Sequence, residues 1–138
     1  MTDENDPMLI ETTGPRAAVT AYMSDEIALI DPSTTLRQAA VALEDAGVGC
    51  LAVGTPDAVE GVVSERDILR AVAEGLDLDA TSVGGVESTE LKWATPDSTI
   101  GEVAQEMMEN YVRHVPVGTD RRLVGMVSMR DALAALLT

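Results

Sequence analysis

Apolar residues along this chain alternate between two spacings, one typical of strands and the other typical of helices. The apolar run Ile27–Ile30 ends at Asp31-Pro32, which predicts a short strand closed by a turn. The apolar residues that follow recur every three or four positions, which predicts an amphipathic helix. Ser33 or Thr34 can cap the start of this helix, and Gly47 can end it. The apolar face of the helix consists of Leu36, Ala39, Ala40 and Leu43.

Two more apolar runs and a second helix complete this part of the chain. Cys50–Val53 and Val59–Val63 are separated by Gly54-Thr55-Pro56-Asp57, whose residue types favour a hairpin turn. Ser64 then opens a helix that extends to about Glu74. The predicted order of elements is therefore βαββα.

The second half of the chain repeats this order. Its predicted elements are a strand near Leu91–Ala94, a helix from about Ser98 to Asn110, a hairpin from Val115 to Val127 that turns at Gly118–Arg121, and a helix from Met129 to Leu137.

A single offset relates the two halves. A shift of 64 positions superposes Gly61–Leu69 on Gly125–Leu133 without a gap. The same shift aligns turn residues and apolar residues elsewhere, so the chain contains an internal duplication. These further matches are Pro32 with Pro96, Thr35 with Thr99, Ala40 with Ala104 and Val48 with Val112.

The duplication divides the chain into segments. Residues 1–16 are polar and acidic without periodicity, which predicts a flexible tail. We expect the first repeat at 17–74, a glycine-containing linker at 75–85 and the second repeat at 86–138. Because a unit of about sixty residues buries little surface by itself, the two repeats are expected to form one module.

The composition adds a large negative charge to this picture. The chain has 138 residues, 46% of them hydrophobic, a formal net charge of −15 and a single lysine, Lys92. The excess of acid argues against nucleic acid as a partner, because nucleic acid requires a basic face. An acidic chain with one lysine and no Phe resembles proteins of salt-loving microbes, whose surface carboxylates keep them hydrated. An ordinary acidic cytosolic protein is the alternative.

Few residues offer catalytic or metal-binding chemistry. Cys50 is the only cysteine, so neither an intrachain disulfide nor a thiolate metal site can form. His114 is the only histidine and falls in a predicted hairpin without a nucleophile motif. No stretch has the eighteen or so apolar residues of a membrane span, and the start MTDENDP lacks the features of a signal peptide. We therefore expect a cytoplasmic protein that is not an enzyme and does not bind membranes.

Two stretches resemble a known domain. Val112–Val117 followed by Leu123–Asp131 resembles the second half of a CBS domain, in which an apolar-Pro-Val strand precedes a Gly-x-Val-Ser-x-x-Asp junction between strand and helix. Gly61–Asp67 resembles the same junction. With two copies at one offset, the chain is similar to a CBS-domain pair, or Bateman module. The resemblance implies an α/β (α+β) fold of tandem βαββα repeats, with pseudo-twofold symmetry and small sheets flanked by helices.

The two junctions contain the candidate binding residues. A helix N-terminus attracts phosphate because its first backbone N–H groups are unpaired and its dipole is positive there. The resemblance implies that the Asp of each junction accepts ribose hydroxyls and that the Ser and the Arg lie near phosphate. The same Ser-x-x-Asp pattern also fits a capping box, which only satisfies backbone groups of the helix. The candidates are Ser64, Arg66 and Asp67 in the first repeat and Ser128, Arg130 and Asp131 in the second.

The second repeat carries further candidates. Arg113, His114 and Pro116 lie where the first repeat has Gly49-Cys50-Leu51-Ala52, so a basic pair and the proline typical of the family occur in only one repeat. We therefore predict that the second repeat, with Asp131, forms the stronger phosphate site.

The resemblance implies regulation rather than catalysis. The expected ligand is an adenine nucleotide (AMP, ADP or ATP) or S-adenosylmethionine, acting as a regulatory ligand and not as a cofactor. The expected output is a change of shape passed to a separate effector enzyme or transporter, and the expected assembly is a homodimer. The alternative is a structural dimerisation module whose clefts are empty or hold S-adenosylmethionine.

A chain with this charge is expected to gain stability from salt. Repulsion among surface carboxylates acts over about 30 Å at 0.01 M salt and is screened in molar salt. We expect thermal melts at constant pH to show a melting temperature that rises from dilute buffer to molar KCl. A melting temperature indifferent to salt would identify an ordinary acidic protein.

Overall fold

The computed structural model describes residues 13–138 and contains two units of mixed α and β structure. The predicted fold class is confirmed. The first unit forms a three-stranded sheet in the order β1-β2-β3, with β1 parallel and β3 antiparallel to β2. Its elements are β1 (Leu29–Ile30), α1 (Leu36–Ala46), β2 (Cys50–Thr55), β3 (Ala58–Ser64) and α2 (Glu65–Ala73).

The second unit has one strand fewer. Its elements are α3 (Ile100–Asn110), β4 (His114–Thr119), β5 (Arg122–Ser128) and α4 (Met129–Leu136). A 3₁₀ helix precedes each unit: η1 (Val19–Ala21) precedes the first, and η2 (Val83–Gly85) precedes the second. The strand predicted at Leu91–Ala94 is wrong, since only Ala94 bridges to Val117. In the first unit the N–H of Ala52 donates to the carbonyl of Ala28 at 3.0 Å, in the pairing of β2 with the first strand. The aligned Pro116 has no N–H, so the corresponding hydrogen bond cannot form in the second unit.

The first helix begins one or two residues later than predicted. Asp31 accepts hydrogen bonds from the N–H (2.8 Å) and the hydroxyl (2.6 Å) of Ser33, which holds Ser33 in the preceding turn. Thr35 is the N-cap of α1 and forms a capping box with Gln38, with both distances at 3.1 Å. The prediction of Ser33 or Thr34 as the cap is therefore wrong, whereas the predicted end at Gly47, with φ of 65°, is confirmed.

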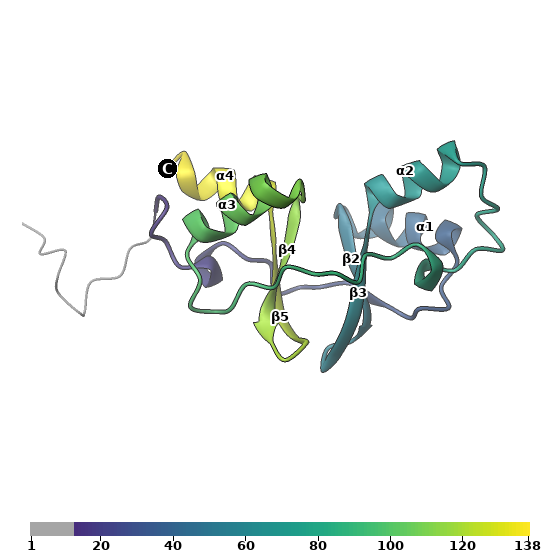
Figure 1. Cartoon of the computed structure of the whole chain (residues 1–138), viewed down its shortest axis with the longest axis horizontal. Coiled ribbons are helices and arrows are strands. Elements are labelled where there is room, and N and C mark those ends of the chain that lie inside the picture. Colours follow the sequence, from purple (N-terminus) through teal and green to yellow (C-terminus); the bar gives the residue numbers. More distant parts are fainter. Residues whose placement is uncertain (1–12) are drawn as a thin grey trace, which may run out of the picture.

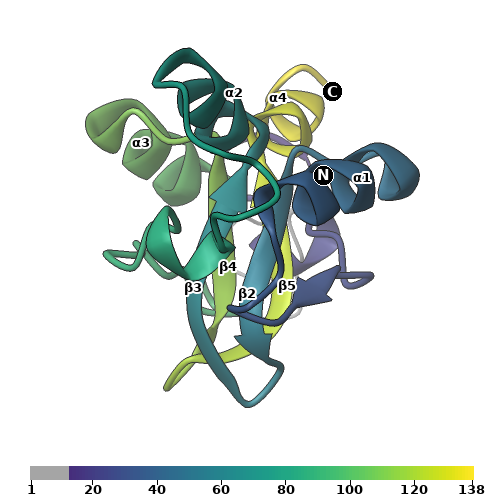
Figure 2. The ribbon, with the colours of Figure 1, turned by 90° about the vertical axis from the view of Figure 1, so that its right-hand side faces the viewer.

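The two sheets pack face to face in the middle of the molecule. Figure 1 shows β2 and β3 beside β4 and β5, with α1 and α2 on one flank and α3 and α4 on the other. Ala52, Val59 and Leu123 are buried between the sheets, where Trp93 packs against them. The four helices lie at one end of the sheets and the hairpin turns at the other (Figures 1 and 2).

The 3₁₀ helix that precedes each unit packs into the core of the other unit. Val19 is fully buried with core residues of the second unit, and its N–H donates to the carbonyl of Ser98 at 2.9 Å. Val83 is fully buried with core residues of the first unit, and its N–H donates to the carbonyl of Thr34 at 2.8 Å. The exchange is symmetric because each pair is related to the other by the shift of 64 positions.

The same exchange continues into the sheets. Ser24 bridges to Met126 on β5, and Ser88 bridges to Val62 on β3, each through two backbone hydrogen bonds of 2.9 to 3.0 Å. The predicted linker at 75–85 therefore includes a segment, η2, that lies within the first unit's core.

The predicted N-terminal tail is only partly described. Residues 1–12 lie outside the described residues. Next to them, the carbonyl of Pro15 accepts a hydrogen bond from Gly101 (2.9 Å), and the N–H of Gly14 donates to Ala135 (2.9 Å). The last residues of the predicted tail are thus bound to the second unit.

Several apolar side chains remain exposed on the last helix of each unit. Leu69 and Val72 on α2 and Leu133 and Leu136 on α4 occupy equivalent positions and are between 39% and 68% exposed. By contrast, Leu36, Leu43 and Ile100 on the first helices face inward and are buried. Within residues 13–138, no helix combines the length and the apolar character needed to cross a membrane.

Substitution of Val83 tests the exchange of segments. Val83→Ala removes two methyl groups from the core of the first unit, so we expect the free energy of unfolding to fall by about 2 kcal/mol in urea denaturation. Val41→Ala, at a 53% exposed position on α1, is the matched control and is expected to change it by no more than about 0.5 kcal/mol. Equal effects of the two substitutions would show that the exchanged segment does not support the first unit.

Candidate functional site

Both Ser-x-x-Asp junctions form complete capping boxes. At the start of α2, the N–H of Ser64 donates to Oδ2 of Asp67 (2.8 Å), and the N–H of Asp67 donates to Oγ of Ser64 (3.3 Å). At the start of α4, the N–H of Ser128 donates to Oδ2 of Asp131 (2.8 Å), and the N–H of Asp131 donates to Oγ of Ser128 (3.1 Å). The capping alternative therefore describes the local geometry of both junctions.

Capping engages Oδ2 and leaves Oδ1 of each Asp for another partner. Oδ1 of Asp67 lies 3.4 Å from the guanidinium of Arg70, one turn along α2. Among residues 13–138, Oδ1 of Asp131 has no hydrogen-bond partner. Each carboxylate can accept a further hydrogen bond, so helix capping and ligand binding are compatible at both junctions.

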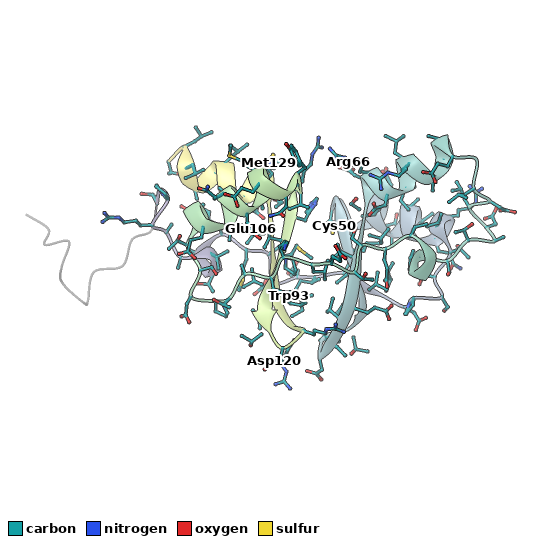
Figure 3. All side chains as sticks on the ribbon, viewed as in Figure 1. Cys50, Arg66, Trp93, Glu106, Asp120 and Met129 are labelled. Carbon is teal, nitrogen blue, oxygen red and sulfur yellow. The ribbon has the colours of Figure 1, made fainter. Side chains whose placement is uncertain are left out.

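The start of each hairpin holds the start of the helix that follows it. The carbonyl of Gly49 accepts a hydrogen bond from Glu65 (3.0 Å), and the carbonyl of Arg113 accepts one from Met129 (2.7 Å). Figure 3 shows Met129 and Arg66 on either side of the midline, with Cys50 below Arg66. The two helix N-termini therefore face the contact between the two units.

Two clefts open beside these helix starts. The larger, which we name the Asp131 cleft, has a volume of about 730 Å³ and lies between α1 and α4. From the second unit it is lined by Arg113, His114, Met126 and residues 128–131, and from the first by Ser24, Glu26, Ile27, Ala28, Ala40, Leu43, Glu44, residues 47–50, Glu65 and Ile68.

The smaller cleft, which we name the Asp67 cleft, has a volume of about 390 Å³ and lies between α2 and the end of α3. It is lined by Gly49, Cys50, Val62, residues 64–67 and Arg70 of the first unit, and by Ser88, residues 90–92, residues 110–114 and Pro116.

The structure groups the predicted site residues differently from the sequence analysis. Pro116 lies in the Asp67 cleft and not beside Asp131, and Arg113 and His114 line both clefts. From the aligned repeats, all three are expected beside Asp131 in the second repeat. The reason is geometric, because the face-to-face sheets bring the hairpin start of each unit to the helix start of the other.

Both halves of the chain also match a known family. A model of the CBS domain matches residues 19–74 and 83–138. This chain belongs to the CBS-domain family. The predicted pair of domains is confirmed, and the second match begins at the exchanged segment that contains Val83.

The CBS pair is similar to proteins of bacteria and archaea. The CBS domain-containing protein YhcV of Bacillus subtilis is 31% identical over 116 residues, which cover 83% of this chain and 82% of that protein. A structure of an uncharacterized conserved protein from Pyrococcus horikoshii matches with a TM-score of 0.81 at 28% identity, over 88% of this chain and 92% of that one. A CBS domain protein from Pyrobaculum aerophilum, solved in complex with AMP, matches with a TM-score of 0.77 at 28% identity, over 87% and 98% of the two chains.

The cations of this CBS pair are concentrated at its clefts. Five of the nine Lys and Arg residues line one or both clefts, although the chain has 24 carboxylate residues. Within residues 13–138, four of these five form no ion pair, and only Arg70 is paired, with Asp67. Because these four cations are not paired with a carboxylate, they can bind an anionic ligand. The four are Arg66, Lys92, Arg113 and Arg130.

The charge balance differs between the clefts. The Asp131 cleft has two cations, Arg113 and Arg130, and four acidic side chains. The Asp67 cleft has four cations and three acidic side chains. Arg113 and His114, on which the prediction of a stronger site beside Asp131 rests, line both clefts, and the Asp67 cleft has the more positive charge balance.

Burial shifts the pKa values of His114 and Cys50, two titratable groups that line both clefts. Burial lowers the pKa of His114, although the nearby charges of Glu65 and Asp131 oppose this shift, so the imidazole is neutral at pH 7. Burial, with a further contribution from the charge of Asp67, raises the pKa of Cys50 to about 12. Cys50 is therefore a buried thiol and not a nucleophile.

Tyr111 is a cleft residue that the sequence analysis did not select. It is the C-cap of α3 with φ of 55°, at the position aligned with Gly47, and its side chain is 87% exposed at the Asp67 cleft. A left-handed backbone is costly for a residue with a Cβ. The available signal was an aromatic residue at the aligned position where the first repeat has a helix-ending glycine.

Opposite substitutions at these aligned positions test the backbone cost. Tyr111→Gly relieves the left-handed conformation but increases the entropy of the unfolded chain, so we expect a net gain of about 0.5 kcal/mol in the free energy of unfolding. Gly47→Ala is the matched reverse change, with open space around the added Cβ, and is expected to lose about 1 kcal/mol. Urea denaturation measures both, and a loss of stability in Tyr111→Gly would mean that the ring makes stabilising contacts.

Proposed function

We propose that this CBS pair is a regulatory module that binds an adenine nucleotide and transmits its ligand state to a separate partner protein. The observation that carries the proposal is the placement of five of the nine cations around two helix N-termini in a chain of net charge −15. A phosphate there meets the positive end of a helix dipole and guanidinium groups together. Binding, rather than catalysis, is the proposed activity.

The volumes of the clefts and a structural relative of the protein support a nucleotide as the ligand. Volumes of about 390 and 730 Å³ lie in the range of small-molecule pockets, which is roughly 300 to 1,000 Å³. The protein from Pyrobaculum aerophilum, with the same fold, was solved with AMP. We therefore take AMP as the first ligand to test, ahead of ADP, ATP and S-adenosylmethionine.

Each part of a nucleotide has a matching group in the Asp67 cleft. Arg66 and Lys92 are assigned to the phosphate, because both are exposed and unpaired in the described chain. Oδ1 of Asp67 is assigned to the ribose hydroxyls. The ring of Tyr111 and the apolar surface of Pro116 are assigned to the base.

The output of the module is proposed to act through its helices. The exposed apolar side chains of α2 and α4, such as Leu69 and Leu133, support a homodimer that buries these faces. Since α2 and α4 also begin at the clefts, a ligand that shifts either helix shifts the same surface. The partner that receives the signal is proposed to be a separate enzyme or transporter.

A structural dimerisation module is the second candidate. Its support is that both Ser-x-x-Asp junctions satisfy their own helix starts without a ligand. Such a module would bind no nucleotide, or S-adenosylmethionine alone, while retaining the exposed apolar faces.

Calorimetric titration with AMP and adenosine separates the two candidates. We expect AMP to bind, and Arg66→Gln and Lys92→Gln each to weaken it about tenfold, the lower end for a lost charge-assisted hydrogen bond. Adenosine, which has no phosphate, should be nearly unaffected by either change. Arg130→Gln in the Asp131 cleft should weaken AMP less than Arg66→Gln does.

Arg37→Gln is the control, because Arg37 is an exposed cation paired with Asp79 outside both clefts. It removes the same charge and should leave AMP binding unchanged. Equal losses in Arg37→Gln and Arg66→Gln would mean that AMP responds only to net charge. No binding of AMP, ADP, ATP or adenosine would favour the structural module.

A further inference from the structure

Five residues separate the two clefts and belong to both. We name them the shared wall: Gly49, Cys50, Glu65, Arg113 and His114. Gly49 and Cys50 are aligned with Arg113 and His114 by the shift of 64 positions, so the wall lies where the two units meet. A ligand in either cleft therefore contacts groups that the other cleft also uses.

The shared wall is thin and tightly packed. A Cβ added at Gly49 would lie 3.2 Å from both Cε1 and Nε2 of His114 and 3.3 Å from Oε1 of Glu65. The imidazole thus rests directly on the backbone of the first unit. Packed protein atoms therefore lie between the clefts at this point, and charges on the two sides interact more strongly through them than through water.

Arg113 is the only cation common to the two clefts. Its side chain is exposed and forms no ion pair with any of residues 13–138, so it can turn toward either side. A guanidinium binds a phosphate through a planar pair of N–H donors, which it can direct at one phosphate at a time. His114 adds no second cation, because burial keeps its ring neutral at pH 7.

We propose that Arg113 makes phosphate binding in the two clefts mutually unfavourable. A phosphate in one cleft draws the guanidinium away from the other and places a like charge across the shared wall. The module then responds over a wider range of nucleotide concentration than two independent sites would. This inference rests on the proposed nucleotide binding and adds a regulation of the same two clefts.

Variants with one cleft filled provide the reference affinities. Ala40 is half-buried on α1 and lines only the Asp131 cleft, so Ala40→Trp places an indole there to block AMP. Ser88 is exposed and lines only the Asp67 cleft, so Ser88→Trp fills that one. Neither substitution alters the shared wall. Calorimetry with AMP on each variant gives the association constant of the cleft that remains open.

The wild-type protein then reports the coupling. We expect the product of its two stepwise association constants for AMP to be about tenfold lower than the product of the two single-cleft constants, a typical coupling between sites. For adenosine the two products should be equal, because no phosphate competes for Arg113. In the Arg113→Gln background, each AMP constant should fall but the two products should become equal.

Four outcomes would overturn the inference. Equal products for AMP in the wild-type protein would show independent clefts, and a deficit that persists in the Arg113→Gln background would assign the coupling to other groups. A filled-cleft variant that is folded by circular dichroism yet binds no AMP would show that its open cleft is not a nucleotide site. If the wild-type protein binds no AMP or adenosine at all, the proposed function fails first, and the inference fails with it.

Discussion

Val19 and Val83 are each fully buried in the core of the unit that follows or precedes their own, and this exchange organises the molecule. A unit of about sixty residues buries little apolar surface by itself and is only marginally stable, and here each unit gains a buried segment from its neighbour. The exchanged segments fix the units around a pseudo-twofold axis and bring both hairpin starts to it. The clefts, their shared wall and the facing helix N-termini all result from that arrangement.

Charge placement gives the clefts their chemical character. A chain with 24 acidic residues and nine basic ones could pair every cation at its surface, but four of the five cations at the clefts form no ion pair within residues 13–138. Exposed ion pairs contribute little stability, so leaving cations unpaired costs little. At the clefts the same cations lie beside helix N-termini, where their charge and the helix dipole act on a ligand together.

The order of elements and the duplication could be predicted from the sequence because both depend on local spacing. The start of α1 could not, since Asp31 holds Ser33 in a turn and leaves the cap to Thr35. The composition of the clefts was predicted wrongly for another reason. A constant offset shows which residues are equivalent, as Arg113 is to Gly49, but not which residues become neighbours once the units pack. Assigning Pro116 to the Asp131 cleft treated equivalence as proximity.

The exchange of segments makes this single chain the covalent counterpart of a domain-swapped dimer. Two copies of one repeat could form the same contacts by trading their leading strips, but their association would depend on protein concentration. The connection between the units turns that encounter into an intramolecular step, at an effective concentration on the order of millimolar for a short flexible connection. Because the two repeats are fused in one chain, their sequences can differ, as at Gly49 in the first repeat and Arg113 in the second. Two identical copies related by an exact twofold axis could not form clefts that differ in this way.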